Sequence, residues 1–227
     1  MNNNLLSGTI EAVLFDLDGT LMETDDHMVG RLAMVLSRLR LRNPVRLSRR
    51  MVMRAETPVN GLITFFDRLG LDRAVMALFR RGKKVRGRAV RPPHPMMTGV
   101  GEMLGSLKGK FRLGLVTSNS QEEAERFMAE NGITGFFDVV VTRSSVRRLK
   151  PHPEPLLFAA RHLGTEPGKC LMVGDTTPDM KSAVAAGAIP IGVLCGFGTE
   201  RELLKAGAEL ILEETRQLTD WLPRAPQ

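Results

Sequence analysis

The sequence has few cysteines and no long apolar run, and both scarcities restrict the classes of protein that fit it. Its 227 residues include two cysteines, Cys170 and Cys195. Each lies at one end of an apolar run, so we expect two core thiols instead of a disulfide, and a reducing, cytoplasmic setting. No apolar stretch reaches the roughly 18 residues that a transmembrane helix needs, so no membrane association is expected.

The first residues also lack the features of a secretory signal peptide. MNNNLLSGTIEAVLF at 1–15 has no basic start and no small-residue cleavage site. With 43% hydrophobic residues, the chain can bury a substantial core. Its length suits one large domain, or a core domain that carries a smaller insert.

Positive charge is concentrated in one part of the chain. Residues 30–91 hold 17 Lys and Arg against three acidic residues, a net charge of +14, and the remainder holds 15 against 22, a net charge of −7. Such a stretch suits an anionic ligand or surface, but a solvated helical surface has the same composition. The charge distribution leaves both interpretations open.

Short apolar runs alternate with helix-like segments through most of the sequence. The runs are rich in Val, Leu and Ile, and they occupy 11–15, 112–117, 137–142, 170–175 and 189–194. Helix signals between them include glycine stops at Gly132 and Gly164 and a first-turn proline, Pro178. Together they indicate the α/β class, with a Rossmann-like parallel sheet that carries helices on both faces.

The segment from 23 to 95 interrupts this alternation. It contains no convincing strand, and its apolar residues recur at helical spacing in four stretches. It closes with RPPHP at 91–95, a stiff proline-rich connector. We therefore predict a core domain formed by 1–22 and 96–227, with 23–95 inserted into it as an α-helical bundle.

Polar residues follow the predicted strands where each strand ends. In chain order they are Asp16, Asp18, Thr117, Ser118, Asn119, Lys150, Asp175 and Asp179. Because the carboxyl ends of parallel strands meet at one edge of a sheet, we expect these groups around a single crevice. Four aspartates and one lysine suit a hard cation and a phosphate, and the absence of Cys or His clusters favours Mg²⁺ over zinc.

Four motifs that contain these residues resemble those of the haloacid dehalogenase-like hydrolase superfamily, specifically its phosphatases. They are DLDGT at 16–20, LVTSN at 115–119, LKPHPEP at 149–155 and GDTTPDM at 174–180. GFGTERELLKAGAELILEE at 196–214 is similar to the last strand-and-helix segment of the family. The resemblance is greatest to the phosphoglycolate phosphatase group, and it implies that the helical insert is a mobile cap over the active site.

The resemblance also implies a role for each motif residue. Asp16 is the nucleophile that forms an aspartyl-phosphate, and Asp18 protonates the leaving oxygen and then activates water. Thr117 and the amide of Ser118 hold the phosphoryl oxygens, and Lys150 neutralises the charge that develops on them.

Asn119 either contacts phosphate or shapes its loop. Mg²⁺ binds the carboxylate of Asp16, the backbone carbonyl of Asp18 and the carboxylate of Asp175. Asp179 completes the acidic set by orienting a metal-bound water or the lysine, although a helix cap is the alternative for this residue.

The predicted cap supplies candidates for substrate recognition. RAETPVNG at 54–61 lies at about the turn where related caps reach the active site. Arg54, Glu56 and Asn60 are therefore expected to contact the substrate, and Arg54 suits a carboxylate or a second phosphate. The alternative is that these residues only cap the next helix.

Together these features predict a Mg²⁺-dependent phosphatase that hydrolyses a small phosphorylated metabolite, either phosphoglycolate-like or a sugar phosphate. Asp18 argues against a dehalogenase, because dehalogenases lack the second aspartate. Two alternatives remain: a phosphomutase of the β-phosphoglucomutase kind, and a protein that binds a polyanion through the basic insert. Nucleic acid is not the expected partner, and the chain is expected to be a monomer or a homodimer.

Overall fold

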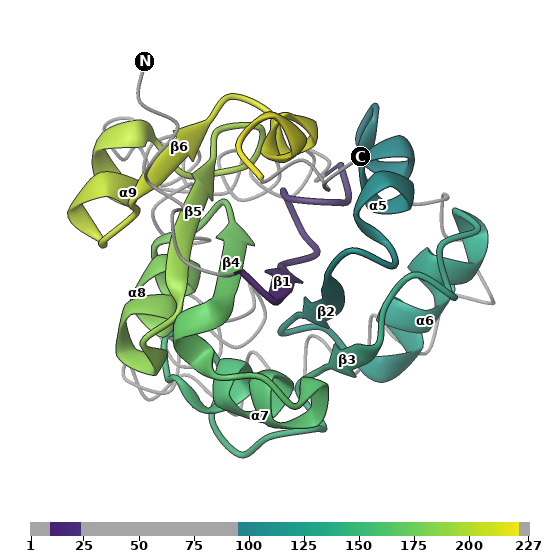
Figure 1. The fold of residues 1–227 in the computed structure, drawn as a ribbon, viewed down its shortest axis with the longest axis horizontal. Coiled ribbons are helices and arrows are strands. Elements are labelled where there is room, and N and C mark those ends of the chain that lie inside the picture. The colour runs from purple at the N-terminus through teal and green to yellow at the C-terminus, as the bar shows by residue number, and fades with distance from the viewer. Residues whose placement is uncertain (1–9, 24–94, 223–227) are drawn as a thin grey trace, which may run out of the picture. The chain divides into compact units, whose positions relative to one another are not determined.

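The computed structural model describes residues 10–23 and 95–222, which form one parallel β-sheet flanked by helices (Figure 1). The strand order is β3-β2-β1-β4-β5-β6. The strands are β1 (Ala12–Phe15), β2 (Arg112–Val116), β3 (Val139–Val141), β4 (Cys170–Gly174), β5 (Ile189–Val193) and β6 (Leu210–Leu212). The first five coincide with the predicted apolar runs to within two residues, so the parallel-sheet prediction is confirmed. The sixth lies in the C-terminal segment that resembles the last strand-and-helix segment of the family.

Helices connect the strands in the described ranges. They are α5 (Val100–Leu107), α6 (Gln121–Glu130), α7 (Glu154–Leu163), α8 (Thr177–Ala186), α9 (Glu200–Lys205) and the 3₁₀ helices η1 (Pro167–Lys169) and η2 (Thr215–Asp220). The expected signals are in place: Gly164 follows α7 with a left-handed φ of 63°, and Pro178 lies in the first turn of α8. Helix α5 is an element that the sequence patterns did not predict.

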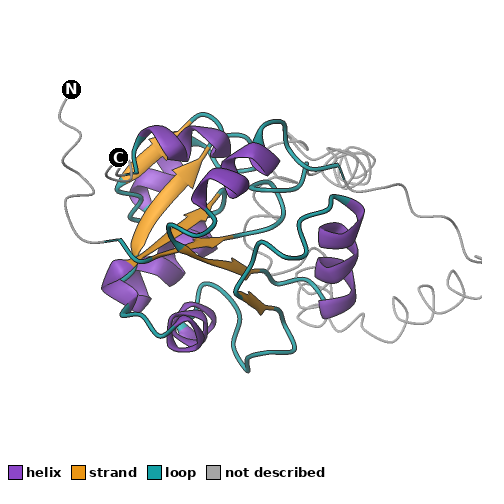
Figure 2. Cartoon of the chain, turned by 45° about the vertical axis from the view of Figure 1, so that its right-hand side comes forward, coloured by secondary structure: helices purple, strands orange, loops and turns teal. Residues whose placement is uncertain are grey.

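Both faces of the sheet are covered by helices, as Figure 2 shows. On β1, Val13 and Phe15 belong to a core shared with α5, α6 and η2, whereas Ala12 and Leu14 belong to a core shared with α7 and α8. Successive strand residues point to opposite faces, so a strand buried on both sides must be apolar at every position. This explains why β1 reads as a continuous apolar run, and it makes the end of that strand a rigid platform.

The ends of the predicted insert lie next to each other. The Glu23 amide donates to the Pro95 carbonyl at 2.9 Å, and the Met97 amide donates to the Leu21 carbonyl at 2.9 Å. A domain inserted into a folded core must leave and re-enter the core at neighbouring points, because the core strands on either side of the insert still have to pack together. The four predicted helices of the insert lie outside the described residues, so its division from the core stays a prediction.

Two further expectations can be compared with the described residues. Cys170, buried in β4, and Cys195, half-buried after β5, are free thiols, as predicted. No helix of the described ranges combines the length and the apolar character that crossing a membrane requires.

Candidate active site

The candidate site lies at the carboxyl end of the sheet, where the hydrogen-bond ladder extends one residue past the strands. Asp16 follows β1, and its amide donates to Val173 of β4 at 2.9 Å. Thr117 follows β2, and its amide donates to Val141 of β3 at 2.9 Å. These bonds hold the backbone of both polar residues as firmly as that of the strands. Precise placement of this kind is what a reacting group requires.

Lys150 occupies the centre of the site. Its Nζ lies 2.6 Å from Asp16 Oδ1, 2.6 Å from Asp179 Oδ1 and 3.0 Å from the carbonyl oxygen of Val116. An ammonium group has three donors, so these partners use all of them. Exposed fractions of 5% for Lys150, 6% for Asp16 and 1% for Asp179 show that the interactions are shielded from water. The structure therefore brings together three residues from three of the sequence motifs.

Asp175 completes an acidic cluster with Asp16 and Asp179. It is fully buried directly after β4, and one carboxylate oxygen from each aspartate lies within 4.8 Å of the others. With three carboxylates and one ammonium, the cluster carries a formal charge of −2 when all four groups are ionised. A single divalent cation would neutralise that charge.

The pKa shifts of the cluster also indicate that its negative charge exceeds its positive charge. Burial raises the pKa of Asp16 to about 7, and the attraction of Lys150 offsets this only in part while Asp179 and Asp18 add to it. Burial, together with the neighbouring Asp16 and Asp179, raises the pKa of Asp175 well above its usual range. Burial alone would lower the pKa of Lys150, but Asp16 and Asp179 outweigh it and raise that pKa.

This donor set fits a hard divalent cation. The aspartate oxygens are the ligands that such ions prefer, and the negative charge is buried and only partly balanced by Lys150. Asp16 and Asp175 each keep a carboxylate lone pair with which to bind an ion. Asp179 has Oδ1 bonded to Lys150 and Oδ2 bonded to the amide and hydroxyl of Thr176, so it suits the orienting role that the sequence suggested.

Asp179 also caps a helix while it contacts Lys150, and its role in the site stays a prediction. Its Oδ2 accepts from the Thr176 amide at 3.0 Å, in the capping box that begins α8, while its Oδ1 accepts from Lys150. One carboxylate thus ties the first turn of α8 to the lysine. We conclude that a cap role and a site role do not exclude each other here.

Asn119 contacts Asp18 in this structure. Its Nδ2 donates to Asp18 Oδ2 at 2.7 Å, and its amide donates to Thr117 Oγ1 at 3.1 Å. Ser118 is half-buried between its two neighbours in the loop after β2. The loop therefore places Asn119 beside Asp18.

The remaining candidates fall elsewhere. Arg54, Glu56 and Asn60 lie outside the described residues, and their substrate contacts stay predictions. The structure adds contacts that sequence reasoning missed: Asp175 accepts hydrogen bonds from the Thr20 hydroxyl and the Phe197 amide. Thr20 was visible as the last residue of DLDGT, but nothing local to it indicates a partner 155 residues away.

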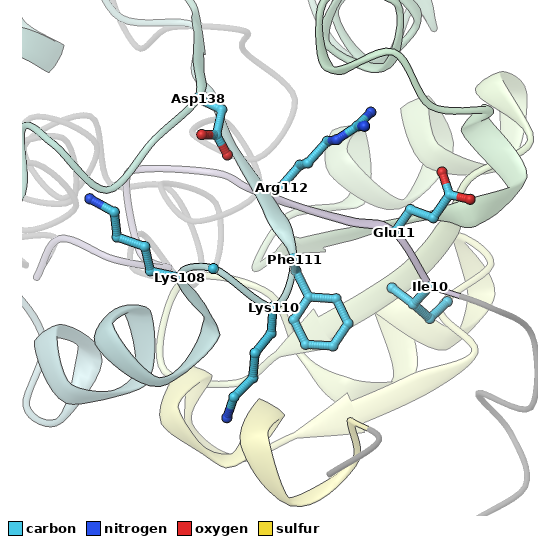
Figure 3. A pocket seen from close by; sticks show the side chains of 8 residues that line it. Ile10, Glu11, Lys108, Lys110, Phe111, Arg112 and Asp138 are labelled. Atoms are coloured by element: carbon cyan, nitrogen blue, oxygen red, sulfur yellow. The ribbon is translucent and has the colours of Figure 1, made fainter. Parts of the chain in front are cut away.

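A pocket at the opposite end of the sheet does not form a comparable site. It is lined by residues at the start of β1 and β2, among them Lys108, Lys110 and Arg112 (Figure 3). These three side chains point away from one another, and two of them already bind carbonyl oxygens: Lys108 that of Gly135, and Arg112 those at the end of α7. Cationic side chains that diverge, two of them already bonded to carbonyl oxygens, do not form an anion site.

Comparisons with known proteins agree with this geometry. Residues 13–193 match the family described as haloacid dehalogenase-like hydrolase. The chain is 30% identical over 217 residues to pyrophosphatase PpaX of Bacillus pumilus, covering 92% of this chain and 95% of that protein. It is 26% identical over 236 residues to phosphoglycolate phosphatase of Nitrosococcus oceani, covering 95% of this chain and 97% of that protein.

A solved structure is also similar over nearly the whole chain. The putative β-phosphoglucomutase of Thermotoga maritima superposes with a TM-score of 0.64 at 27% identity, covering 93% of this chain and 97% of that one. Three similar proteins thus carry three different activity names at comparable identity, so the similarity alone does not select a substrate. The family match spans all four strand-end motifs, and the chain therefore belongs to the haloacid dehalogenase-like hydrolases, as one of their phosphatases.

Proposed function

We propose that the protein is a Mg²⁺-dependent phosphatase that hydrolyses a small phosphate monoester through an aspartyl-phosphate on Asp16. The observation that carries this proposal is the buried cluster in which Lys150 joins Asp16 to Asp179 beside Asp175. A structural ion pair would need one carboxylate for one ammonium. This cluster instead holds excess negative charge around the residue at the tip of β1, where a phosphate dianion could be met by a cation.

In the first step, a carboxylate oxygen of Asp16 attacks phosphorus, and the bond from phosphorus to the leaving oxygen breaks. Asp18 in its acid form gives that oxygen its proton, so the product leaves as a neutral alcohol. Lys150 and the groups of the loop after β2 stabilise the negative charge on the phosphoryl oxygens. A bound Mg²⁺ would supply further charge neutralisation, held by Asp16, Asp175 and the backbone carbonyl of Asp18.

In the second step, Asp18 is a carboxylate and can take a proton from water as the water oxygen attacks phosphorus. The bond between phosphorus and the Asp16 oxygen breaks, which releases inorganic phosphate and restores both carboxyl groups to their starting states. The two aspartates have different surroundings: Asp16 is buried against Lys150, whereas Asp18 is half-exposed and accepts a hydrogen bond from Asn119, a contact that suits the carboxylate form needed in the second step.

Substrate choice is assigned in this proposal to the insert, 23–95, acting as a cap over the core formed by 1–22 and 96–227. Arg54, Glu56 and Asn60 are its proposed contacts with the substrate. The adjacency of Glu23 and Pro95 supports an inserted domain at this point. Phosphoglycolate or a sugar phosphate is the proposed class, since a carboxylate or a hydroxylated ring would each give such residues a partner.

The test is phosphate release from a panel of esters, with Mg²⁺ and with chelator. The panel includes phosphoglycolate, several sugar phosphates and inorganic pyrophosphate, and Asp16→Asn serves as the matched inactive control. Metal-dependent release from a monoester by the wild type, and none by the variant, supports the proposal. Release from pyrophosphate alone would keep the chemistry and overturn the substrate class.

The phosphomutase alternative is supported by the similarity to the putative β-phosphoglucomutase structure. It predicts an isomerised sugar phosphate, formed only with a bisphosphate activator, in place of free phosphate. The polyanion alternative is supported by the +14 net charge of residues 30–91. It predicts nucleic acid binding that weakens steeply with salt, and a folded protein that releases no phosphate from any ester.

A further inference from the structure

We infer that two loops form a cradle that orients Asp175 and thereby sets the affinity of the acidic cluster for its cation. The Asp175 cradle consists of Gly19 and Thr20, which follow the catalytic aspartates, and Gly196–Gly198, which follow β5. The inference rests on the proposed metal site, and it assigns positioning roles to residues that make no contact with the substrate in the proposed chemistry.

Every acceptor of Asp175 is engaged by the cradle. Oδ1 accepts from the Thr20 hydroxyl at 3.3 Å, and Oδ2 accepts from the Phe197 amide at 2.7 Å. The Asp175 carbonyl accepts from the Gly198 amide at 2.9 Å. Each carboxylate oxygen has a second lone pair, so these bonds fix the plane of the carboxylate while leaving it able to bind an ion.

The glycines of the cradle are required by close packing against Asp175. A Cβ at Gly196 would lie 2.0 Å from Asp175 Oδ2, and one at Gly19 would lie 2.4 Å from the same atom. A Cβ at Gly198 would lie 2.3 Å from the Asp175 carbonyl oxygen. Atoms that are not bonded cannot approach so closely, so any larger residue would push the carboxylate or the loop aside. Gly19 also has a backbone φ of 75°, a value that residues other than glycine rarely adopt.

The cradle is itself tied together at its base. Thr215, at the start of η2 and 1% exposed, donates its hydroxyl to the Thr20 carbonyl at 2.7 Å. Cys195 Sγ lies 3.5 Å from the Gly19 carbonyl oxygen, which links the loop after β5 to the loop after β1. Two loops distant in sequence thus meet around one carboxylate, and Thr215 supports both of them.

We therefore expect the affinity for Mg²⁺ to depend on the cradle residues that hold Asp175, although they do not bind the ion themselves. A carboxylate held in the right plane loses little freedom when it binds an ion, whereas a loose one must be ordered at that moment. Removal of such supporting groups typically weakens metal binding by about 10–100-fold. The cradle therefore predicts a loss in Mg²⁺ affinity that excess Mg²⁺ can overcome.

The test compares Thr20→Val with Thr20→Ser by calorimetric titration of the full-length protein with Mg²⁺. Valine matches threonine in shape but lacks the hydroxyl, and serine keeps the hydroxyl. We expect the Kd for Mg²⁺ to rise by about 10-fold or more in Thr20→Val and to stay near the wild-type value in Thr20→Ser. A Kd in Thr20→Val within about twofold of wild type would overturn the inference.

Thr142→Val is the matched control. Thr142 is also fully buried and follows β3 at the same edge of the sheet, but its hydroxyl bonds to Gln121 and Ser144. Its loss should lower stability without changing the Kd for Mg²⁺. An equal rise in Kd in this control would show that general loosening, and not the cradle, controls affinity.

A second pair of variants keeps the test decisive if Thr20→Val does not fold in chelator. Thr215→Val removes the support for the Thr20 backbone and the contact with Cys195 Sγ but no bond to Asp175 itself, so it should give a smaller rise in Kd, and Gly196→Ala should give a larger one. Unchanged affinity in both variants would overturn the inference. The proposed function fails separately, if wild type binds Mg²⁺ but releases no phosphate from the ester panel.

Discussion

Lys150→Met offers the sharpest check of the electrostatic account of the site. Methionine keeps most of the length and apolar surface of the lysine but removes the charge. It leaves Asp16 and Asp179 buried without the ammonium that now lies 2.6 Å from each of them. Breaking a buried ion pair by removing one partner typically costs about 3–5 kcal/mol, because a charge stays buried without compensation.

The size of this effect can be compared with the bonds that are lost. Two of the three hydrogen bonds of Lys150 are to carboxylates and one is to a carbonyl. All three bonds have the charged ammonium as donor, so net contributions of about 1.5–3 kcal/mol each are at least as large as the range for a broken pair. For a chain of this size, each kcal/mol shifts the melting temperature by roughly 2–4 °C, so a fall of roughly 6–20 °C is expected.

The assay is urea and thermal unfolding of the metal-free protein near neutral pH, with Lys169→Met as the control. Lys169 also forms an ion pair, at 2.9 Å with Glu11, but both side chains are exposed, and water screens such a pair. The stability deficit of Lys150→Met should shrink in acid, because protonated carboxyl groups no longer need an ammonium. If both lysine variants lose the same small amount, the interpretation of Lys150 as the charge centre of the site is wrong.

Four further outcomes are expected. Asp16→Asn should abolish Mg²⁺-dependent phosphate release without unfolding the chain, and turnover that survives in a purified variant would contradict its assignment as nucleophile. Asp18→Asn should slow single-turnover release of an alkyl alcohol by about 10²–10⁴-fold but that of p-nitrophenol far less, since nitrophenolate leaves without a proton; equal losses would remove the general acid. With the pKa of Asp16 raised from its ordinary value of 3.8 to about 7, the contribution of Asp16 to the stability of the metal-free protein should be fully present below that ordinary value and should be lost as pH rises through about 7. Because Mg²⁺ competes with that proton, the melting-temperature gain from Mg²⁺ should be larger near about pH 8 than near about pH 5.5, and the opposite trend would exclude the acidic cluster as the binding site.

The sequence predicts those parts of this fold that depend on local patterns. The residues of β1 and β4 are apolar at every position because both faces are covered, and a continuous apolar run is visible without any alignment. Helix α5 escaped prediction, although Val100, Met103, Leu104 and Leu107 are buried along it. It begins after Gly99, which makes no side-chain cap, so the usual start signal is missing.

The candidate site also has parts that local sequence patterns predict and parts that they do not. Asp16, Lys150, Asp175 and Asp179 could be placed together because parallel topology puts the ends of their strands at one edge of the sheet. The partners of those residues could not be placed, since they depend on side-chain contacts across the chain. Asn119 was expected at the phosphate or as a loop residue, and its bond to Asp18 joins residues 101 positions apart. The Thr20 contact with Asp175 spans 155 positions.

The buried acidic cluster also explains why the active site depends on this particular fold. Three ionised carboxylates in a dry environment oppose folding, and the single ammonium of Lys150 offsets only part of their charge. Backbone donors supply much of the remaining compensation: the amides of Phe197 and Thr176 each donate to a carboxylate of the cluster. Those amides come from loops that a parallel sheet brings to the ends of its strands. The fold therefore carries a buried excess of negative charge at the edge of the sheet, and that excess suits a divalent cation.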